Sequence, residues 1–137
     1  MPWAILDTNV YIDHWEGRLT ADALASVRKS FVVRHSAVVL SELRRGARTF
    51  AARRRVEDLH RVAAAAWEPT EAEWWEAGRI ILKIGDTQGW EAGKRRDFQN
   101  DTLIALTARR HGATVVTRDR RDFDLLSDEL RVRTLAI

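Results

Sequence analysis

The sequence predicts an α/β fold in which a short, mainly parallel sheet packs between helices. Short apolar or β-branched segments alternate along the chain with longer segments of helical spacing, an order typical of this fold class. The apolar segments are continuous rather than alternating, which indicates strands buried on both faces, as in parallel sheets. The predicted strands are residues 3–6, 31–33, 114–117 and 132–137, with a further candidate strand at 62–67.

Five helices are expected from apolar residues that recur every three or four positions and from residues that cap helix ends. Thr70 and Glu73 have the spacing of a capping box, in which each side chain bonds the backbone amide of the other. Gly112 is expected to follow the end of a helix. Residues 85–93 contain three glycines and are expected to form a loop. The helices are predicted at about 20–30, 37–47, 49–65, 70–84 and 101–111.

Length and composition predict one soluble, cytoplasmic domain that spans residues 1–137. A chain of 137 residues has the length of a single domain. It contains no cysteine, which excludes disulfides, thiolate metal sites and cysteine nucleophiles. No apolar run approaches the roughly 20 residues that a membrane span needs. The segment MPWAILD lacks the basic start of a signal peptide, so no association with a membrane is expected.

The basic residues favour a nucleic-acid partner. The net charge is only +3, but 20 of the 23 basic residues are arginines, which bind phosphate through two parallel hydrogen bonds. A codon bias toward arginine is an equally good explanation of that ratio. The clustering is more informative: residues 43–55 hold six arginines and no acid, and Lys94, Arg95 and Arg96 form a second group. Clusters of this kind are typical of nucleic-acid binding.

Four acidic side chains lie where chemistry is expected in such a fold. Asp7 follows the first predicted strand and Asp119 follows the strand at 114–117, so both are expected at the carboxyl edge of the sheet, where functional crevices lie. Glu42 and Asp101 lie on predicted helices beside apolar residues. Taken singly, each acid is explained as well by a helix cap, a turn or a favourable position in the helix dipole.

Four stretches that contain these acids occur together in this chain. They are 5–10 (ILDTNV), 41–46 (SELRRG), 100–108 (NDTLIALTA) and 115–123 (VVTRDRRDF). In this combination the chain resembles the PIN-domain ribonucleases, and in particular the VapC-type toxins of bacterial toxin–antitoxin pairs. The resemblance extends from Asp7 to Phe123. It implies a three-layer α/β/α fold with a short, mainly parallel central sheet, and an endoribonuclease dependent on Mg²⁺ or Mn²⁺ that acts as the toxin of a type II pair.

The metal requirement also makes physical sense. Carboxylates gathered in one pocket repel one another, and a hard divalent cation with oxygen ligands relieves that repulsion. Asp7 and Asp101 are the expected direct ligands, Glu42 is expected to act through a water molecule, and Asp119 is expected to complete a second ion site. Asp122 is the alternative fourth acid, or else a cap of the next turn. Thr8, Asn9 and Thr117 are expected to orient the carboxylates, although ordinary turn hydrogen bonds explain them equally well.

The resemblance further implies a homodimer and a cognate antitoxin that inserts a segment into the acidic site. Trp74 and Trp75 are candidates for the dimer interface because they are bulky and close to a helix start. The candidate contacts to the RNA backbone are Arg44, Arg45, Lys94, Arg95 and Arg96. Phosphate contacts of this kind position a substrate without reading its sequence, so transfer, ribosomal and messenger RNA all stay open as targets.

Three other functions compete with the toxin. The first is a PIN-like nuclease that processes RNA and has no antitoxin. The second is a phosphatase of the haloacid-dehalogenase type with Asp7 as nucleophile, but that family places a second aspartate where this chain has Asn9. The third is a nucleic-acid-binding module without catalysis, which leaves the acids unexplained because acids in a phosphate-binding groove hinder binding unless a cation intervenes.

Overall fold

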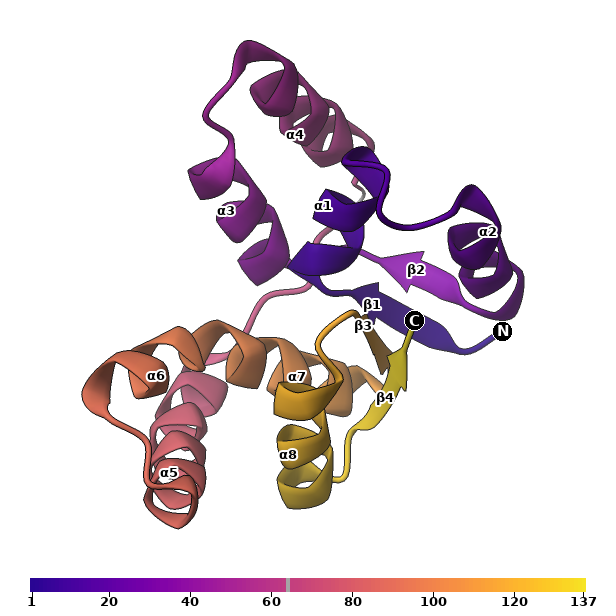
Figure 1. Cartoon of the computed structure of the whole chain (residues 1–137). Helices are drawn as coiled ribbons and strands as arrows, with labels where there is room; N and C mark the ends of the chain where they lie inside the picture. The colour runs from indigo at the N-terminus through magenta and orange to yellow at the C-terminus, as the bar shows by residue number, and fades with distance from the viewer. Residues whose placement is uncertain (64) are drawn as a thin grey trace.

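The computed structural model describes residues 1–63 and 65–137, and in it a four-stranded parallel sheet lies between two layers of helices (Figure 1). The strand order is β2-β1-β3-β4. The strands are β1 (Trp3–Leu6), β2 (Val32–Arg34), β3 (Thr114–Thr117) and β4 (Arg133–Ala136). The predicted α/β fold with a parallel sheet is therefore confirmed, with small shifts in the bounds of β2 and β4.

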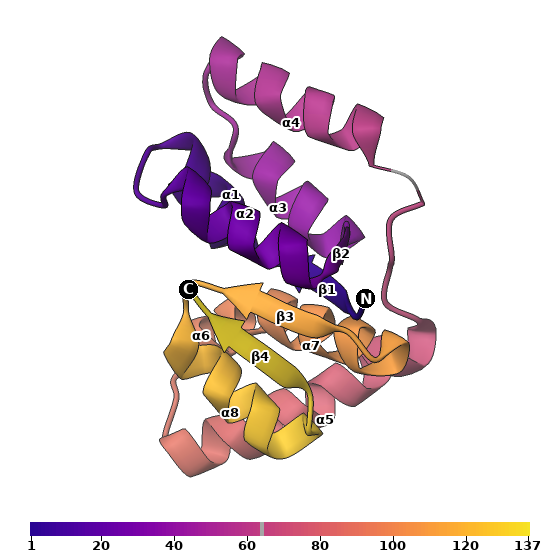
Figure 2. The same cartoon turned by 90° about the vertical axis from the view of Figure 1, so that its right-hand side faces the viewer.

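Helices cover both faces of this sheet. Figure 2 shows α1 to α4 above the sheet and α5 to α8 below it, which confirms the three-layer α/β/α arrangement. The helices of the described residues are α1 (Thr8–Trp15), α2 (Ala21–Ser30), α3 (Ala37–Gly46), α4 (Phe50–Val62), α5 (Glu71–Gln88), α6 (Ala92–Asp97), α7 (Gln99–His111) and α8 (Arg120–Leu130).

Helix α7 is the most deeply buried helix, and it fixes one of the candidate acids. Residues 102–108 are all buried, as expected for a helix that has neighbours on every side. Its two buried threonines need hydrogen-bond partners there: the Thr102 hydroxyl donates to the Phe98 carbonyl and the Thr107 hydroxyl to the Leu103 carbonyl. Asp101 lies in the first turn of this helix. None of the described helices is long and apolar enough to span a membrane.

The predicted loop at 85–93 is shorter in the structure and covers only residues 89–91. Helix α5 continues through Gly85 to Gln88, and α6 begins at Ala92. Gly85 packs against its neighbours instead of breaking the helix, because a Cβ atom there would lie 2.9 Å from the guanidinium carbon of Arg95. The turn itself is made by Gly89, whose φ of 69° suits a glycine.

Other boundaries also differ from the prediction. Helix α4 ends at Val62 and not near residue 65, so Val62 cannot begin a strand. The candidate strand at 62–67 reduces to one bridge between Ser36 and Trp67, and residue 64 within it lies outside the described residues. Helices α1, α6 and α8 were not predicted. Each is short or amphipathic and begins directly after an acidic cap, namely Asp7, Glu91 and Asp119.

The burial of α7 predicts that truncating a leucine there lowers the free energy of unfolding far more than truncating an exposed leucine on another helix. Leu103 is fully buried, whereas Leu82 on α5 is 58% exposed. Leu103→Ala should lower the free energy of unfolding by about 2–5 kcal/mol because it leaves a cavity, and Leu82→Ala by less than about 0.5 kcal/mol. Urea denaturation followed by circular dichroism measures both values. Equal effects of the two substitutions would contradict the assigned core.

Candidate metal centre

The site begins at the carboxyl ends of β1 and β3, which are neighbours in the sheet. Their register pairs Leu6 with Val116, so the residues that follow, Asp7 and Thr117, lie side by side. The backbone amide of Asp7 donates to the Val116 carbonyl at 2.8 Å, and the Thr117 hydroxyl donates to Asp7 Oδ2 at 2.8 Å. The same hydroxyl oxygen accepts the backbone amide of Asp119 at 2.9 Å. Thr117 thus holds Asp7 and the start of the next loop together.

Asp7 is a buried carboxylate that also caps a helix. Only 3% of the residue is exposed, and its Oδ1 accepts the backbone amide of Thr8 at the start of α1. Burial raises the pKa of Asp7 to about 6, and the charges of Glu42 and Asp119 add to the rise. The hydrogen bonds from Thr117 and Thr8 oppose it. The net result is a carboxyl that is protonated below about pH 6 and that a nearby cation would shift toward its charged form.

Glu42 reaches the same region from α3. The Thr8 hydroxyl donates to Glu42 Oε1 at 2.8 Å, so the residue after Asp7 fixes a second acid. Asn9 is used differently: its Oδ1 accepts the backbone amide of Arg118 at 3.1 Å and thereby ties α1 to the loop after β3. Thr8 and Asn9 therefore both make side-chain contacts that join segments far apart in the sequence.

Three further acids lie together beside this pair. Asp101, Asp119 and Asp122 each offer a carboxylate oxygen, and these atoms lie within 4.8 Å of one another. Asp101 lies in the first turn of α7, whereas Asp119 caps α8 and Asp122 lies in its first turn. Burial is the largest cause that raises the pKa of Asp101 to about 8, followed by the negative charges of Asp7, Glu42, Asp122 and Asp119. Five acids from four parts of the chain therefore share one electrostatic environment.

This donor set fits a hard divalent cation. Carboxylate oxygens are the ligands that Mg²⁺ and Mn²⁺ prefer, and a positive ion would favour the charged forms that burial and mutual repulsion disfavour. The cluster of three aspartates could hold such an ion, while Asp7 and Glu42 contribute charge from close by.

The roles of Asp119 and Asp122 differ in one respect from the expectation. Asp119, and not Asp122, caps the next helix: its Oδ1 accepts the backbone amide of Asp122 at 3.2 Å. The suggestion that Asp122 caps a turn is therefore wrong. Asp122 lies in the first turn of α8 and accepts a hydrogen bond at 2.7 Å from the Lys94 ammonium group. Sequence reasoning missed this contact because 28 residues separate the two.

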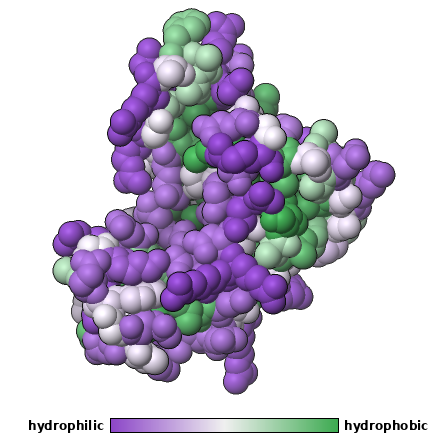
Figure 3. Space-filling model, viewed as in Figure 1, coloured by the Kyte–Doolittle hydropathy of each residue, from purple (hydrophilic) through white to green (hydrophobic). Residues whose placement is uncertain are grey.

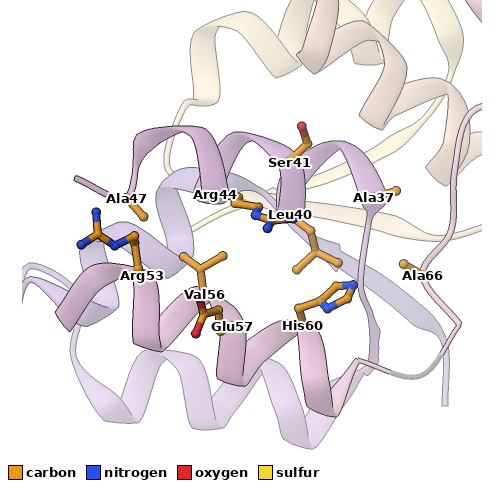
Figure 4. A pocket seen from close by; sticks show the side chains of 10 residues that line it. All are labelled: Ala37, Leu40, Ser41, Arg44, Ala47, Arg53, Val56, Glu57, His60 and Ala66. Carbon is orange, nitrogen blue, oxygen red and sulfur yellow. The ribbon is translucent and has the colours of Figure 1, made fainter. Parts of the chain in front are cut away.

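The basic residues proposed to contact RNA fall into two places. Arg95 is directed at Asp86 and at the Trp90 carbonyl, while Arg96 is exposed. Arg44 and Arg45 lie exposed in the last turn of α3. Figure 4 shows Arg44 among the side chains that line a cavity of about 720 Å³ between α3 and α4. Hydrophilic residues cover most of the face seen in Figure 3.

Comparisons with known proteins agree with this architecture. The family model described as PIN domain matches residues 4–128. The VapBC2 complex of Rickettsia felis, bound to a DNA fragment from its promoter, contains a chain 18% identical to this one with a TM-score of 0.70, covering 98% of both chains. VapBC-1 of nontypeable Haemophilus influenzae contains a chain with 22% sequence identity and a TM-score of 0.71, and the match covers 98% of this chain and 97% of that one. VapBC-5 of Mycobacterium tuberculosis, a member of the VapBC family of toxin–antitoxin systems, contains a chain with 22% sequence identity, a TM-score of 0.63 and full coverage of both chains. No curated protein matches the chain.

The raised pKa values predict how stability depends on pH in the absence of divalent ions. The folded protein keeps the Asp101 proton to a pH near 8 and the Asp7 proton to a pH near 6, whereas the unfolded chain releases both near 3.8. Between these limits the folded state binds more protons, so the free energy of unfolding should fall as the pH rises from 5 to 8. Asp101→Asn should remove much of this fall and stabilise the protein at pH 8 by on the order of 2 kcal/mol.

Urea denaturation at several pH values in EDTA measures this slope. Asp128→Asn, which changes an exposed carboxylate on α8, is the matched control and should leave the slope unchanged. Added Mg²⁺ should stabilise the wild type more at pH 8 than at pH 5.5, because ligand carboxyls must lose their protons. A slope that is the same in the wild type and in Asp101→Asn would contradict the assigned burial of Asp101.

Thr117 offers a second test of the geometry. Thr117→Val keeps the shape of the side chain but removes the hydrogen bonds to Asp7 and to the Asp119 amide. It should lower the free energy of unfolding by about 1–3 kcal/mol, since it leaves buried polar groups unpaired. Thr87→Val is the control, because that hydroxyl bonds only the exposed Lys83 carbonyl of its own helix. Thermal unfolding of both variants compares them, and equal losses would argue against a special role for Thr117.

Proposed function

The chain belongs to the PIN-domain family, and on that premise we propose that it is an endoribonuclease, dependent on Mg²⁺ or Mn²⁺, that acts as the toxin of a type II toxin–antitoxin pair. One observation carries the proposal: Asp101, Asp119 and Asp122 lie within 4.8 Å at the carboxyl edge of a parallel sheet, next to Asp7 and Glu42. Such an edge is where α/β proteins bind their ligands. Acids gathered there without a cation would hinder the binding of a phosphate chain.

Each acid has a role that follows from its surroundings. Asp101 and Asp119 are proposed to bind the ion directly, joined by Asp7, whose carboxylate is oriented by Thr117. Glu42, oriented by the Thr8 hydroxyl, is proposed to position the attacking water. The bound ion would lower the pKa of that water and polarise the phosphate. The outcome is hydrolysis of an RNA phosphodiester bond.

The partners follow from the same proposal. The similar structures are toxin–antitoxin complexes, and the Rickettsia felis complex is bound to promoter DNA. We infer that this chain, as a single cytoplasmic domain of residues 1–137, forms a homodimer and binds a cognate antitoxin. Trp74 and Trp75 on α5 are 50% and 85% exposed and are the candidates for burial in the dimer. Exposed Arg44, Arg45 and Arg96 are the candidates for contact with the RNA backbone.

Cleavage of total cellular RNA by the purified protein tests the proposal. Discrete products should form with Mg²⁺ or Mn²⁺ and disappear with EDTA. Asp7→Asn and Asp101→Asn should each lower the rate at least about a hundredfold, because each removes an ion ligand. Asp128→Asn should leave the rate unchanged, and circular dichroism verifies that every variant is folded.

The alternatives are outcomes of the same experiment. Metal-dependent cleavage that no co-expressed neighbouring gene product inhibits would favour an RNA-processing nuclease without an antitoxin. A folded wild type that binds RNA, binds no divalent ion and cleaves no RNA would indicate a binding module and overturn the proposal. Sequencing the ends of the products would identify the RNA target.

A further inference from the structure

Lys94 has surroundings that differ from those of the other basic residues near the site. Its ammonium group lies 2.7 Å from Asp122 Oδ2, and the Asp122 side chain is only 13% exposed. The same nitrogen lies 5.0 Å from the centre of the Trp90 ring and 5.7 Å from that of Phe98. Ring faces attract cations at these distances. A carboxylate and two aromatic rings therefore hold a positive charge at the rim of the acidic cluster.

The backbone that carries Lys94 is also fixed. Arg95 donates to the Trp90 carbonyl at 2.9 Å and pairs with Asp86 at 3.0 Å, which ties α6 to the end of α5. Gly85 provides the space for that guanidinium group. The Trp90 ring packs edge-on against Phe98 at 4.7 Å. The backbone at Lys94 is thus held by its neighbours, and the Lys94 side chain, 36% exposed, contacts Asp122 and the two rings.

This contact bears on the number of ions that the site can take. Asp122 is one of the three aspartates whose oxygens lie within 4.8 Å. An ion bound to Asp122 would share its carboxylate with the ammonium group, and two cations so close repel each other strongly. Asp101 and Asp119 carry no such contact with Lys94 among the described ion pairs. The chain therefore already supplies a cation to one member of the cluster.

We propose that Lys94 is a built-in cation of the metal centre, which engages Asp122 so that the site binds one divalent ion and not two. The inference rests on the proposed function and settles which acid completes the ion site: Asp119 serves as a ligand, and Asp122 serves as the partner of Lys94. The ammonium group has three donors, and those not used by Asp122 are available for a phosphate oxygen of the substrate. Lys94 therefore takes the place of a second ion in balancing charge.

Direct measurement of Mn²⁺ binding tests this, by isothermal titration calorimetry and by the electron paramagnetic resonance signal of free Mn²⁺. The wild type should bind one ion. Lys94→Met should bind two, because the freed Asp122 carboxylate becomes a ligand. Arg96→Met is the matched control, since it removes an exposed base from the same helix, and it should bind one ion. Asp122→Asn should also bind one ion.

The outcomes separate this inference from the proposed function. Two ions bound to the wild type, or one ion of unchanged affinity bound to Lys94→Met, would overturn the role of Lys94 while leaving a metal-dependent nuclease intact. No ion bound to the folded wild type would overturn both. If Lys94→Met fails to fold, Asp122→Asn decides: loss of ion binding in that variant would make Asp122 a ligand and refute the inference.

Discussion

Parallel pairing between β1 and β3 brings Asp7 into hydrogen-bond contact with Thr117, although 110 residues separate them. This one junction orders the remaining parts of the site. Thr117 also accepts the Asp119 amide and so fixes the position where α8 starts. Thr8, the residue after Asp7, donates to Glu42 and so orients that side chain on α3. Helix α7 brings Asp101 to the site because its buried segment packs on β1 and β3. Without the β1–β3 pairing, the acids would belong to unrelated parts of the surface.

The arrangement carries an electrostatic cost that the fold reduces in several ways. Buried carboxylates lose the solvation of water, and here they also repel one another. Asp7 and Asp119 accept backbone amides at helix starts, where the helix dipole favours negative charge. A proton removes the charge of Asp101 below a pH near 8 and that of Asp7 below a pH near 6. These adjustments leave a site that is stable enough to form yet gains from a cation, which is a common property of metal sites.

Much of the fold followed from local patterns in the sequence. The apolar runs at 3–6 and 114–117, the capping box at Thr70 and the glycine at position 112 are each short-range signals, and the structure agrees with them. The prediction failed where tertiary contacts override such signals. Gly85 has the appearance of a helix breaker, but it is the packing surface for Arg95. Helix α6 is only six residues long and has too few apolar positions to show a period.

The acids of the site were recognisable from their motifs, whereas their mutual arrangement was not. The sequence could suggest that Asp119 or Asp122 completes the cluster, but only the fold shows that Asp119 caps α8. Contacts between Thr8 and Glu42, and between Lys94 and Asp122, join residues 34 and 28 positions apart. No local sequence pattern predicts such contacts, because they depend on how the layers of the fold pack together.

The separation of 110 positions between Asp7 and Thr117 also has a consequence during synthesis of the chain on the ribosome. Helices α1, α3 and α7 can emerge and begin to pack, but β3 is required to orient Asp7 and to bring in Asp119 and Asp122. An unfinished chain therefore lacks part of the acidic cluster until nearly all of it has been translated. A protein of the proposed activity would be made beside messenger and ribosomal RNA, and this order of assembly would keep the nascent chain from cleaving the machinery that is producing it.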